Sequence, residues 1–305
     1  MDIVNMAWGL VAIGLLLLIV LGYWQMIVAE GSYLGPRVVT FLYDLTAPAY
    51  ERIKQFDPGY EQWFLGLPLG QALEKIPSPL VLDVGTGTGR LPRALLFQPA
   101  FRGQVVGIDL SRRMLAHAVQ LAQPYRERLA LIWQDAQDLP FEANSFDAVT
   151  CLEVLEFTPH PQAVLREMVR VLRPGGVLLV TNRVGKDAWV LPRRAFARPD
   201  FEALLRELDL ENVRIQSWQA DYDLVWGVKS GVPRGGGVRP LSQVLRCPAC
   251  HHNPLPSDGT AFTCPRCALS YPVAPDGVIE IARPSHKSVL EQREQPTIPA
   301  EESRI

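Results

Sequence analysis

The chain has almost no excess of either charge and few cysteines. Both facts limit the classes of protein to which it can belong. Its 30 basic and 32 acidic residues leave a formal net charge of -2 over 305 residues. No overall electrostatic attraction therefore favours nucleic acid as a partner. The five cysteines are not dispersed as in a secreted disulfide scaffold, because four of them gather near the C-terminus. No internal repeat is visible.

Residues 3–29 contain no Asp, Glu, Lys or Arg. As a helix they would span about 40 Å, more than the roughly 30 Å of hydrocarbon in a bilayer. Trp8, Tyr23 and Trp24 lie near the two ends, where aromatic rings suit a membrane interface. A signal peptide usually begins with basic residues, and a core helix is rarely apolar on every face. We therefore expect residues 1–30 to form a retained transmembrane helix.

Basic residues follow this apolar run and none precedes it. Arg37, Arg52 and Lys54 lie on its C-terminal side. Because cytoplasmic flanks of membrane helices carry an excess of Lys and Arg, the rest of the chain is expected on the cytoplasmic side. The sequence thus predicts a single-pass membrane protein.

Beyond the apolar run, residues 31–77 are typical of amphipathic helices interrupted by prolines. Residues 78–229 instead alternate short apolar runs with amphipathic stretches, which predicts an α/β fold with a doubly wound, mostly parallel sheet. The expected strands are 80–84, 104–109, 129–134, 146–151 and 177–181, and the expected helices are 91–97, 112–122, 161–172 and 201–208. Two further runs, 213–218 and 222–229, are separated by a short gap and predict antiparallel strands at the sheet edge.

The C-terminal quarter divides by composition into three parts. Residues 230–240 include the sequence GVPRGGG and are expected to be a linker. Residues 241–283 form a cysteine-containing module. Residues 284–305 are charged, lack periodicity and are expected to be disordered.

The segment VLDVGTGTGR, residues 81–90, is the most informative motif. It links an expected strand to an expected helix, and its backbone can turn tightly and approach a ligand at three glycines, Gly85, Gly87 and Gly89. A dinucleotide-binding fingerprint would have a further glycine where this chain has Arg90. Asp83, just before the loop, suits a ligand that carries an ammonium group.

The next expected strand ends in Asp109. A carboxylate at the tip of the second strand can accept both hydroxyls of a ribose. The alternative is a helix N-cap, a role that Ser111 can share.

Taken in order, these segments resemble the class I methyltransferases that depend on S-adenosylmethionine (SAM). The glycine loop and the strand ending in Asp109 resemble motifs I and II of that family. Residues 131–157 resemble its third and fourth strand regions. Residues 166–183 resemble a helix, a Pro-Gly-Gly turn and the fifth strand, and residues 222–229 the final antiparallel strand. The resemblance covers roughly residues 78–229 and implies a Rossmann-like SAM-dependent methyltransferase.

The resemblance implies cofactor-binding roles for individual residues. The three glycines would line the methionine part of SAM, with Asp83 near its ammonium group and Asp109 on its ribose. Leu110 would pack on the adenine, Asp135 and Ala136 would meet its polar edge, and Cys151 would lie near the methionine part. From composition alone, Cys151 is equally a small buried core residue.

The catalytic base stays unidentified. Small-molecule enzymes of this family often carry a Glu-His pair after the fourth strand, where this chain has Glu156-Phe157. Three base candidates remain nearby, Glu153, Glu156 and His160, and each is more typical of a solvated or capping residue than of a base. Four residues, Tyr43, Asp44, Tyr50 and Tyr60, lie where quinone- and lipid-modifying relatives close a lid over the site; helix packing is their alternative role.

The cysteine module contains two Cys-x-x-Cys pairs separated by thirteen residues: Cys247 and Cys250, then Cys264 and Cys267. Four thiolates on two tight turns can form a tetrahedral site that suits Zn²⁺. About 40 residues cannot bury much core, so a metal would supply stability. Disulfides are the alternative. The module resembles the short zinc ribbons that accompany some methyltransferases.

Three functions follow. The favoured one is a membrane-anchored methyltransferase for a small-molecule or lipid- or quinone-like acceptor, because the anchor would hold the site beside an apolar substrate. The requirement for SAM, a cytosolic metabolite, agrees with a cytoplasmic domain. The second is an RNA methyltransferase that docks through the ribbon and its nearby basic residues, although overall charge and anchor disfavour nucleic acid. The third is a non-catalytic membrane scaffold that retains a SAM pocket.

Overall fold

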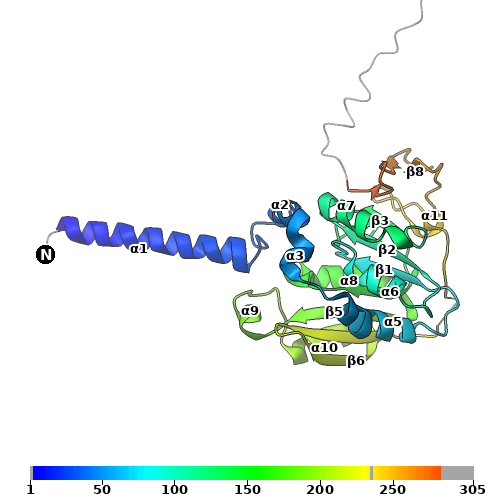
Figure 1. The fold of residues 1–305 in the computed structure, drawn as a ribbon, viewed down its shortest axis with the longest axis horizontal. Coiled ribbons are helices and arrows are strands. Elements are labelled where there is room, and N and C mark those ends of the chain that lie inside the picture. The colour runs from blue at the N-terminus through cyan, green and yellow to red at the C-terminus, as the bar shows by residue number, and fades with distance from the viewer. Residues whose placement is uncertain (1–2, 234–235, 283–305) are drawn as a thin grey trace, which may run out of the picture.

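An eight-stranded sheet organises the chain in the computed structural model, which describes residues 3–233 and 236–282 (Figure 1). Its strand order is β10-β3-β2-β1-β4-β5-β7-β6. The strands are β1 (Leu80–Val84), β2 (Gln104–Asp109), β3 (Leu129–Trp133), β4 (Phe146–Cys151), β5 (Leu172–Arg183), β6 (Leu210–Trp218), β7 (Tyr222–Lys229) and β10 (Ile279–Glu280). The expected tail at residues 284–305 lies outside the described residues.

The central strands pair in parallel, whereas β7 is antiparallel to both β5 and β6. Every residue of β1 and β4 is buried, which explains their continuous apolar runs. The expected doubly wound, mostly parallel sheet with an antiparallel edge is therefore confirmed. Strand order reverses between β1 and β4, and ligands bind at such a switch point, beyond the carboxyl ends of the strands.

Helices cover both faces of the sheet. Two core clusters form where α6 (Arg90–Leu96) and α7 (Arg112–Leu121) pack on one face. On the other face α8 (Pro161–Val171) and α10 (Arg198–Glu207) contribute to the largest cluster. Their boundaries lie within a few residues of those expected from the sequence.

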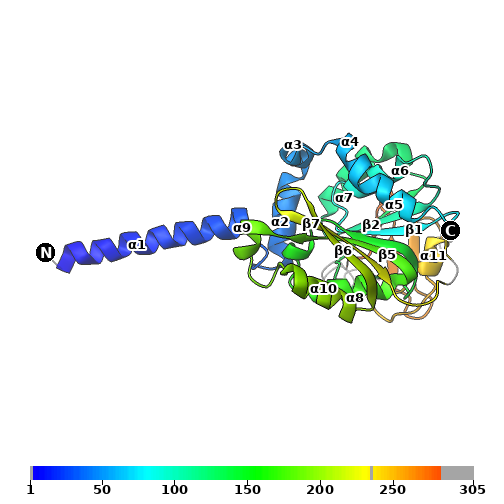
Figure 2. The same cartoon turned by 90° about the horizontal axis from the view of Figure 1, so that it is seen from below.

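Short helices between residues 36 and 72 form a cap over one side of the domain (Figures 1 and 2). They are α2 (Pro36–Thr46), α3 (Tyr50–Lys54), α4 (Pro58–Glu61) and α5 (Leu67–Ala72). Prolines stand at the first turns of α2, α4 and α5, where a missing N–H costs no helical hydrogen bond. The Asp57 carboxylate caps α4 by accepting from the Gly59 and Tyr60 amides.

The apolar N-terminal segment forms α1 (Ile3–Tyr23), followed by a π-helical turn at Trp24–Val28. Residues Ala7–Val28 are long and apolar enough to cross a membrane, with mean hydropathy 2.3, and none of the span is buried against the described chain. That exposure is unlike the core helix of a soluble domain. Both cartoon views show α1 projecting away from the sheet (Figures 1 and 2).

The cysteine module adds the eighth strand, which the sequence did not predict. In β10, Ile279 pairs in parallel with Ile132 and Glu280 with Trp133. Module residues such as Leu245, Leu255 and Phe262 belong to the same core cluster as β4 and α8. The module is thus continuous with the main core.

The glycine-rich stretch before the module is also attached to the sheet. The Gly237 amide donates to the Asp147 carboxylate at 3.0 Å, and the Val238 amide donates to the Ser78 carbonyl at 2.6 Å. Asp147 further accepts from the Leu80 amide at 2.8 Å and pairs with Arg173 at 2.5 Å. One buried carboxylate therefore joins β1, β4, β5 and the segment leading to the module.

We predict that Asp147→Ala lowers the free energy of unfolding by about 3–5 kcal/mol, because it leaves the buried Arg173 guanidinium unpaired. Urea unfolding followed by circular dichroism measures this. The matched control is Glu202→Gln, which breaks an exposed pair of the same 2.5 Å length with Arg206 and should cost less than about 1 kcal/mol. Equal losses in the two variants would contradict the role given to burial.

Candidate active site

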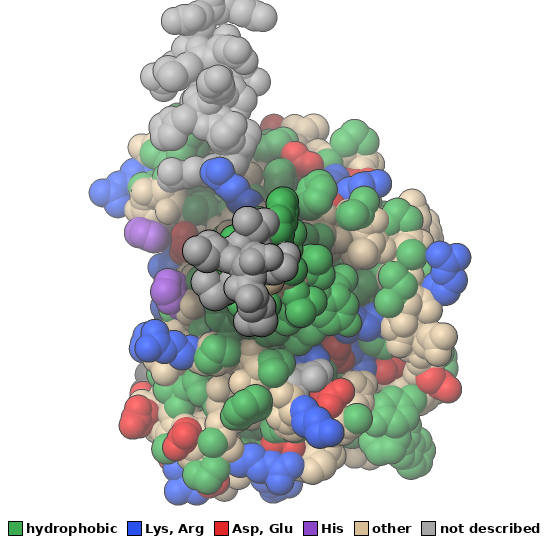
Figure 3. Space-filling model, turned by 90° about the vertical axis from the view of Figure 1, so that its left-hand side faces the viewer, with side chains coloured by type: hydrophobic (Ala, Val, Ile, Leu, Met, Phe, Trp, Pro, Cys, Tyr) green, Lys and Arg blue, Asp and Glu red, His purple; other side chains and the backbone are tan. Residues whose placement is uncertain are grey.

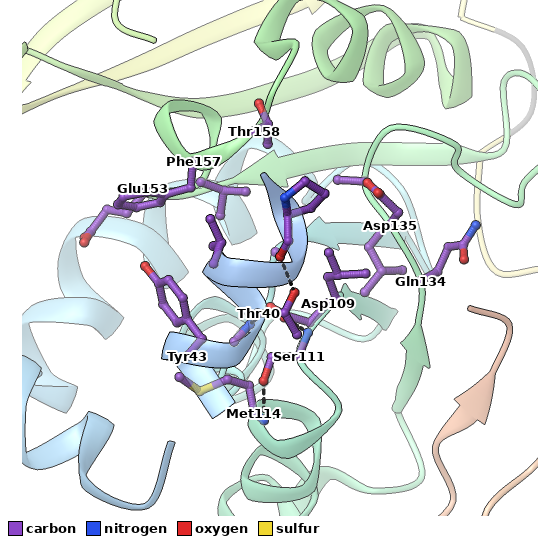
Figure 4. A pocket seen from close by; sticks show the side chains of 18 of the residues that line it. Thr40, Tyr43, Asp109, Ser111, Met114, Gln134, Asp135, Glu153, Phe157 and Thr158 are labelled. Carbon is purple, nitrogen blue, oxygen red and sulfur yellow. Dashed lines mark hydrogen bonds between the residues drawn. The ribbon is translucent and has the colours of Figure 1, made fainter. Parts of the chain in front are cut away.

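A cavity of about 850 Å³, part of it open to solvent, lies over the carboxyl ends of β1, β2, β3 and β4. Figure 4 shows side chains from α2 and from the strand ends converging on it. A second cavity of about 380 Å³ lies beside it. The two share Tyr50, Gly85, Gly87, Leu152 and Glu153, so the glycine loop lies between two adjacent compartments.

The glycine loop presents bare backbone to both compartments. Gly85 and Gly87 have φ values of 68° and 54°, which L-residues with side chains rarely adopt. A Cβ at Gly85 would overlap the Val154 side chain, whereas a Cβ at Gly87 would meet no atom within 4 Å. Only glycine fits at the first position, and at the second the backbone faces open space that a ligand can fill.

Asp109 connects the glycine loop to the loop after β2. Its carboxylate accepts from the Gly87 amide at 2.8 Å and from the Ser111 amide at 2.7 Å. The N-cap of α7 is Ser111, whose hydroxyl accepts from the Met114 amide at 3.1 Å. Asp109 is therefore free of the capping role that the sequence left open. Burial raises the pKa of Asp109 to about 6.

Asp83 lines the smaller compartment at the end of β1. It accepts from the Thr150 hydroxyl at 2.6 Å. Burial raises the pKa of Asp83 to about 6, although this hydrogen bond opposes the effect. Two acidic groups at the strand ends, Asp109 and Asp83, thus line adjacent compartments.

Other expected cofactor residues divide into two groups. Leu110, Asp135 and Ala136 line the larger cavity. Gly89 and Cys151 are not among the residues that line either compartment. Gly89 precedes α6 with a φ of 80°, and Cys151 is buried in the core cluster of β4. Burial raises the pKa of the Cys151 thiol well above its usual value, which does not favour a nucleophile.

The cap supplies a wall that the sequence suggested only by position. Pro36, Val39, Thr40 and Tyr43 lie on one face of α2 and line the larger cavity, and Tyr50 lines both compartments. Asp44 accepts from the Ser111 hydroxyl at 2.5 Å. Tyr60 lines neither compartment and packs against Phe64.

Arg90 fastens the cap to the glycine loop. Its guanidinium pairs with both carboxylate oxygens of Glu61 in α4, at 2.7 and 2.8 Å, and with Glu153 at 2.5 Å. Its centre lies 4.2 Å from the Phe56 ring centroid. In the sequence, Arg90 is notable only because it stands where a dinucleotide-binding fingerprint has its third glycine. No feature of the sequence indicates the partners of Arg90.

Glu51 of α3 makes a second fastening. Its carboxylate accepts from the Thr88 hydroxyl at 2.5 Å and pairs with Arg93 at 2.9 Å. Residues of the glycine loop and of α6 are therefore held by acids from two cap helices.

None of the three acid–base candidates from the sequence is a free base in the cavity. Burial would raise the pKa of Glu153, but Arg90 and Lys54 outweigh it and hold that pKa below its ordinary value. Glu156 is buried, accepts from the Tyr222 hydroxyl at 2.5 Å, and has its pKa raised by burial. Glu156 and His160 line neither compartment.

Comparison with known proteins agrees with this geometry. The family model described as a methyltransferase domain matches residues 82–180. The 2-phytyl-1,4-naphtoquinone methyltransferase of Synechococcus elongatus is 33% identical over 180 residues, which cover 54% of this chain and 77% of the relative. The chain belongs to the class I SAM-dependent methyltransferases. The enzyme class and the SAM cofactor expected from the sequence are confirmed.

Two further proteins, one related in sequence and one similar in fold, extend the comparison. The ubiquinone biosynthesis O-methyltransferase of Chromobacterium violaceum is 33% identical over 131 residues, covering 42% of this chain and 54% of the relative. The crystal structure of the [4+2]-cyclase SpnF superimposes with a TM-score of 0.53 at 20% identity, covering 64% of this chain and 98% of that one. The second likeness concerns the fold alone.

We predict that SAM binding weakens as the pH falls from 7 to 5. SAM is cationic, so it favours ionised over protonated Asp83 and Asp109, whose pKa values near 6 make protonation dominant at pH 5. Each carboxylate that must ionise should raise the Kd about ten-fold over this range. Calorimetric titration of SAM measures the Kd at each pH. Asp83→Asn should remove the part of the pH dependence that Asp83 causes. A Kd that is constant between pH 5 and 7 would contradict the prediction.

Proposed function

We propose that this methyltransferase is anchored to a membrane by α1, has its catalytic domain on the cytoplasmic side, and methylates a small, membrane-soluble quinone-type acceptor. The main support for the proposal is the position of α2 between the apolar span and the cavity. This helix begins at Pro36, soon after the apolar span ends at Val28, and it lines the cavity. An anchor there would hold the cavity at the bilayer surface.

The names of the related enzymes support the substrate class. These enzymes are a 2-phytyl-1,4-naphtoquinone methyltransferase, a demethylmenaquinone methyltransferase and a ubiquinone biosynthesis O-methyltransferase. Much of the cavity wall is suitably apolar, because Pro36, Val39, Val154, Phe157 and Pro159 are among the residues that line it. Such walls suit an aromatic ring that carries a hydrocarbon chain.

For the cofactor, we propose that the larger compartment takes adenosine and the smaller one the methionine part. Asp109 would bind the ribose, Leu110, Asp135 and Ala136 would surround the adenine, and Asp83 would attract the ammonium group. Gly85 and Gly87 would line the passage between the compartments. Gly89 and Cys151 support the loop and the strand from behind.

The residues around the cavity perform alignment and exclusion of water. SAM supplies an electrophilic methyl group on a sulfonium, whose leaving group is neutral, so the main requirement is to hold donor and acceptor in line. The cap helices α2 and α3 cover the cavity from one side. The Asp44–Ser111 hydrogen bond holds α2 there, and the Glu51 contacts hold α3.

Three of the basic residues around the module give the RNA alternative no support; of the others, Arg266 is exposed and Arg234 lies outside the described residues. Lys229 donates to the Val169 and Leu172 carbonyls at 2.6 and 2.7 Å. Arg239 donates to the Ser145 hydroxyl, and Arg246 lies 3.9 Å from a Glu167 oxygen. These cations are engaged with their own fold rather than gathered on an open patch.

We predict that the full chain, incubated with methyl-labelled SAM and membrane extract, transfers label to the quinone-containing lipid fraction. Asp109→Asn should lower transfer and SAM affinity by about ten-fold or more, because an amide cannot accept at both oxygens from Gly87 and Ser111. The control Asp200→Asn, on the exposed first turn of α10, should behave as the parent. Label confined to RNA, or none in any fraction, would overturn the proposal.

We also propose that the module binds one Zn²⁺ through Cys247, Cys250, Cys264 and Cys267. Their sulfur atoms all lie within 4.8 Å of one another, and none is in a disulfide. Tetrahedral zinc with Zn–S distances of about 2.3 Å separates the sulfurs by about 3.8 Å. The observed cluster is compact enough for that geometry.

The two Cys-x-x-Cys turns share one backbone conformation. The His251 amide donates to the Cys247 carbonyl at 2.8 Å, and the Ala268 amide donates to the Cys264 carbonyl at 2.9 Å. Both donors have positive φ, 55° and 59°. Matched turns direct two pairs of thiols to a common centre, as a structural zinc site requires.

The module lies behind the adenine wall of the cavity. Arg112 of α7 pairs with Asp276 at 2.8 Å and Glu280 at 2.9 Å. The Trp133 indole, on the strand beside β10, donates to the Leu110 carbonyl at 2.8 Å. A metal that holds the module would therefore also support the loop proposed to contact adenine.

We predict that Cys264→Ser removes zinc from the purified full chain, lowers the thermal midpoint and weakens SAM binding, because the edge strand loses its support. The control His252→Ala should keep one zinc per chain, since four thiolates complete the shell. Elemental analysis, thermal unfolding and calorimetry measure the three effects. Zinc absent from the parent chain, or retained by Cys264→Ser, would refute the assignment.

A further inference from the structure

The two helices next to α1 expose large apolar side chains. On α2, Phe41 and Leu45 are each 63% exposed, and Leu34 just before the helix is 57% exposed. Trp189, the last residue of α9 (Gly185–Trp189), is 87% exposed. We call these four residues the interfacial patch. Several large apolar groups exposed together usually mark a contact surface.

The two helices that carry most of the patch lie at the base of α1. Figures 1 and 2 both place α2 and α9 beside the end of α1 that meets the domain. Figure 3 looks along α1 toward that face, where the hydrophobic side chains of α1 itself are seen end-on in front of the domain. The patch and the proposed membrane span therefore share one face of the molecule.

Hydrogen bonds fix α9 and the loop after it to the end of the apolar segment. The Trp24 indole donates to the Val190 carbonyl at 3.0 Å, next to Trp189. The Tyr33 hydroxyl donates to the Pro192 carbonyl at 2.9 Å, and Arg194 donates to the Ser32 carbonyl at 3.0 Å. A membrane that holds the apolar segment would thus hold α9 close to its surface.

Basic residues accompany the patch. Arg37 on α2, Lys186 on α9 and Arg193 in the following loop are exposed. Apolar side chains together with Lys and Arg are typical of helices that lie in the interface of an anionic bilayer. Trp189 is also the residue type that prefers the headgroup level.

The two faces of α2 have different surroundings. Pro36, Val39, Thr40 and Tyr43 face the cavity, whereas Phe41 and Leu45, four residues apart, lie together on the exposed side. One helix thus separates the cavity from the surface beside α1.

We infer that the interfacial patch is a second membrane contact, in which Leu34, Phe41, Leu45 and Trp189 enter the headgroup region of an anionic bilayer. This contact rests on the anchoring proposed above and adds to it. It seats the cavity wall formed by α2 against lipid, so a lipid-soluble acceptor can reach the cavity without crossing water. A protein partner on the same patch is the competing occupant.

Tryptophan quenching by brominated phospholipids tests the contact in the full chain reconstituted in vesicles. The chain has seven tryptophans; Trp8 and Trp24 lie in the apolar segment and report its insertion. Trp189→Phe should lose part of the quenchable emission. Trp63→Phe is the matched control, because Trp63 is 66% exposed on the cap between α4 and α5, and it should lose none.

A double variant tests the α2 side of the patch. Phe41→Asp with Leu45→Asp should reduce quenching of Trp189, because two carboxylates oppose insertion beside anionic lipid, while SAM affinity stays that of the parent. Raising the share of phosphatidylglycerol should increase quenching of Trp189 in the parent chain, through the basic residues beside it.

The outcomes separate the two proposals. Loss of quenching in Trp189→Phe but not in Trp63→Phe supports the interfacial contact. Equal quenching in the parent and Trp189→Phe, with Trp8 and Trp24 still quenched, overturns the contact and leaves the anchor intact. No quenching of any tryptophan overturns both. An unquenched Trp189 in pure lipid would also leave a protein partner as the occupant.

Discussion

The buried guanidinium of Arg90 is the interaction on which the site depends. It lies between Glu61 of the cap and Glu153 beyond β4, and the side chains of all three are 10% exposed or less. Removing one partner of such a network leaves a charge unpaired in a poorly solvated place, which is strongly destabilising. The cap and the SAM-binding fold therefore act as one unit, with the cavity between them.

Much of the fold could be predicted because its strands are buried on both faces and appear as continuous apolar runs. The sequence also indicated that the glycine loop, Asp83 and Asp109 would line a ligand cavity. Glycines tolerate the positive φ values of such a loop, and the two acids stand at the ends of expected strands. β10 could not be predicted, because two residues carry no periodic pattern and pair only after the module folds back. The partners of Arg90 were also beyond prediction, because ion pairs between distant segments leave no local signature.

Some residues of the motifs serve the architecture rather than the cavity. Gly89 lies at the start of α6, and Cys151 is a core residue of β4. Conversely, residues outside every motif complete the walls, among them Thr40 and Tyr43 of α2. On the proposed function, the family motifs would hold the cofactor, and the segment after the apolar helix would shape the space left for an acceptor. That division fits a family whose members share one donor and differ in acceptor.

The most direct measurement is a structure of the full chain with S-adenosylhomocysteine bound. We predict adenosine beside Asp109, Leu110 and Ala136, and the amino-acid end beside Asp83. We also predict that α2 still covers the cavity and that Arg90 still lies between Glu61 and Glu153. A ligand bound elsewhere, or a cap displaced with Arg90 turned to solvent, would contradict these predictions.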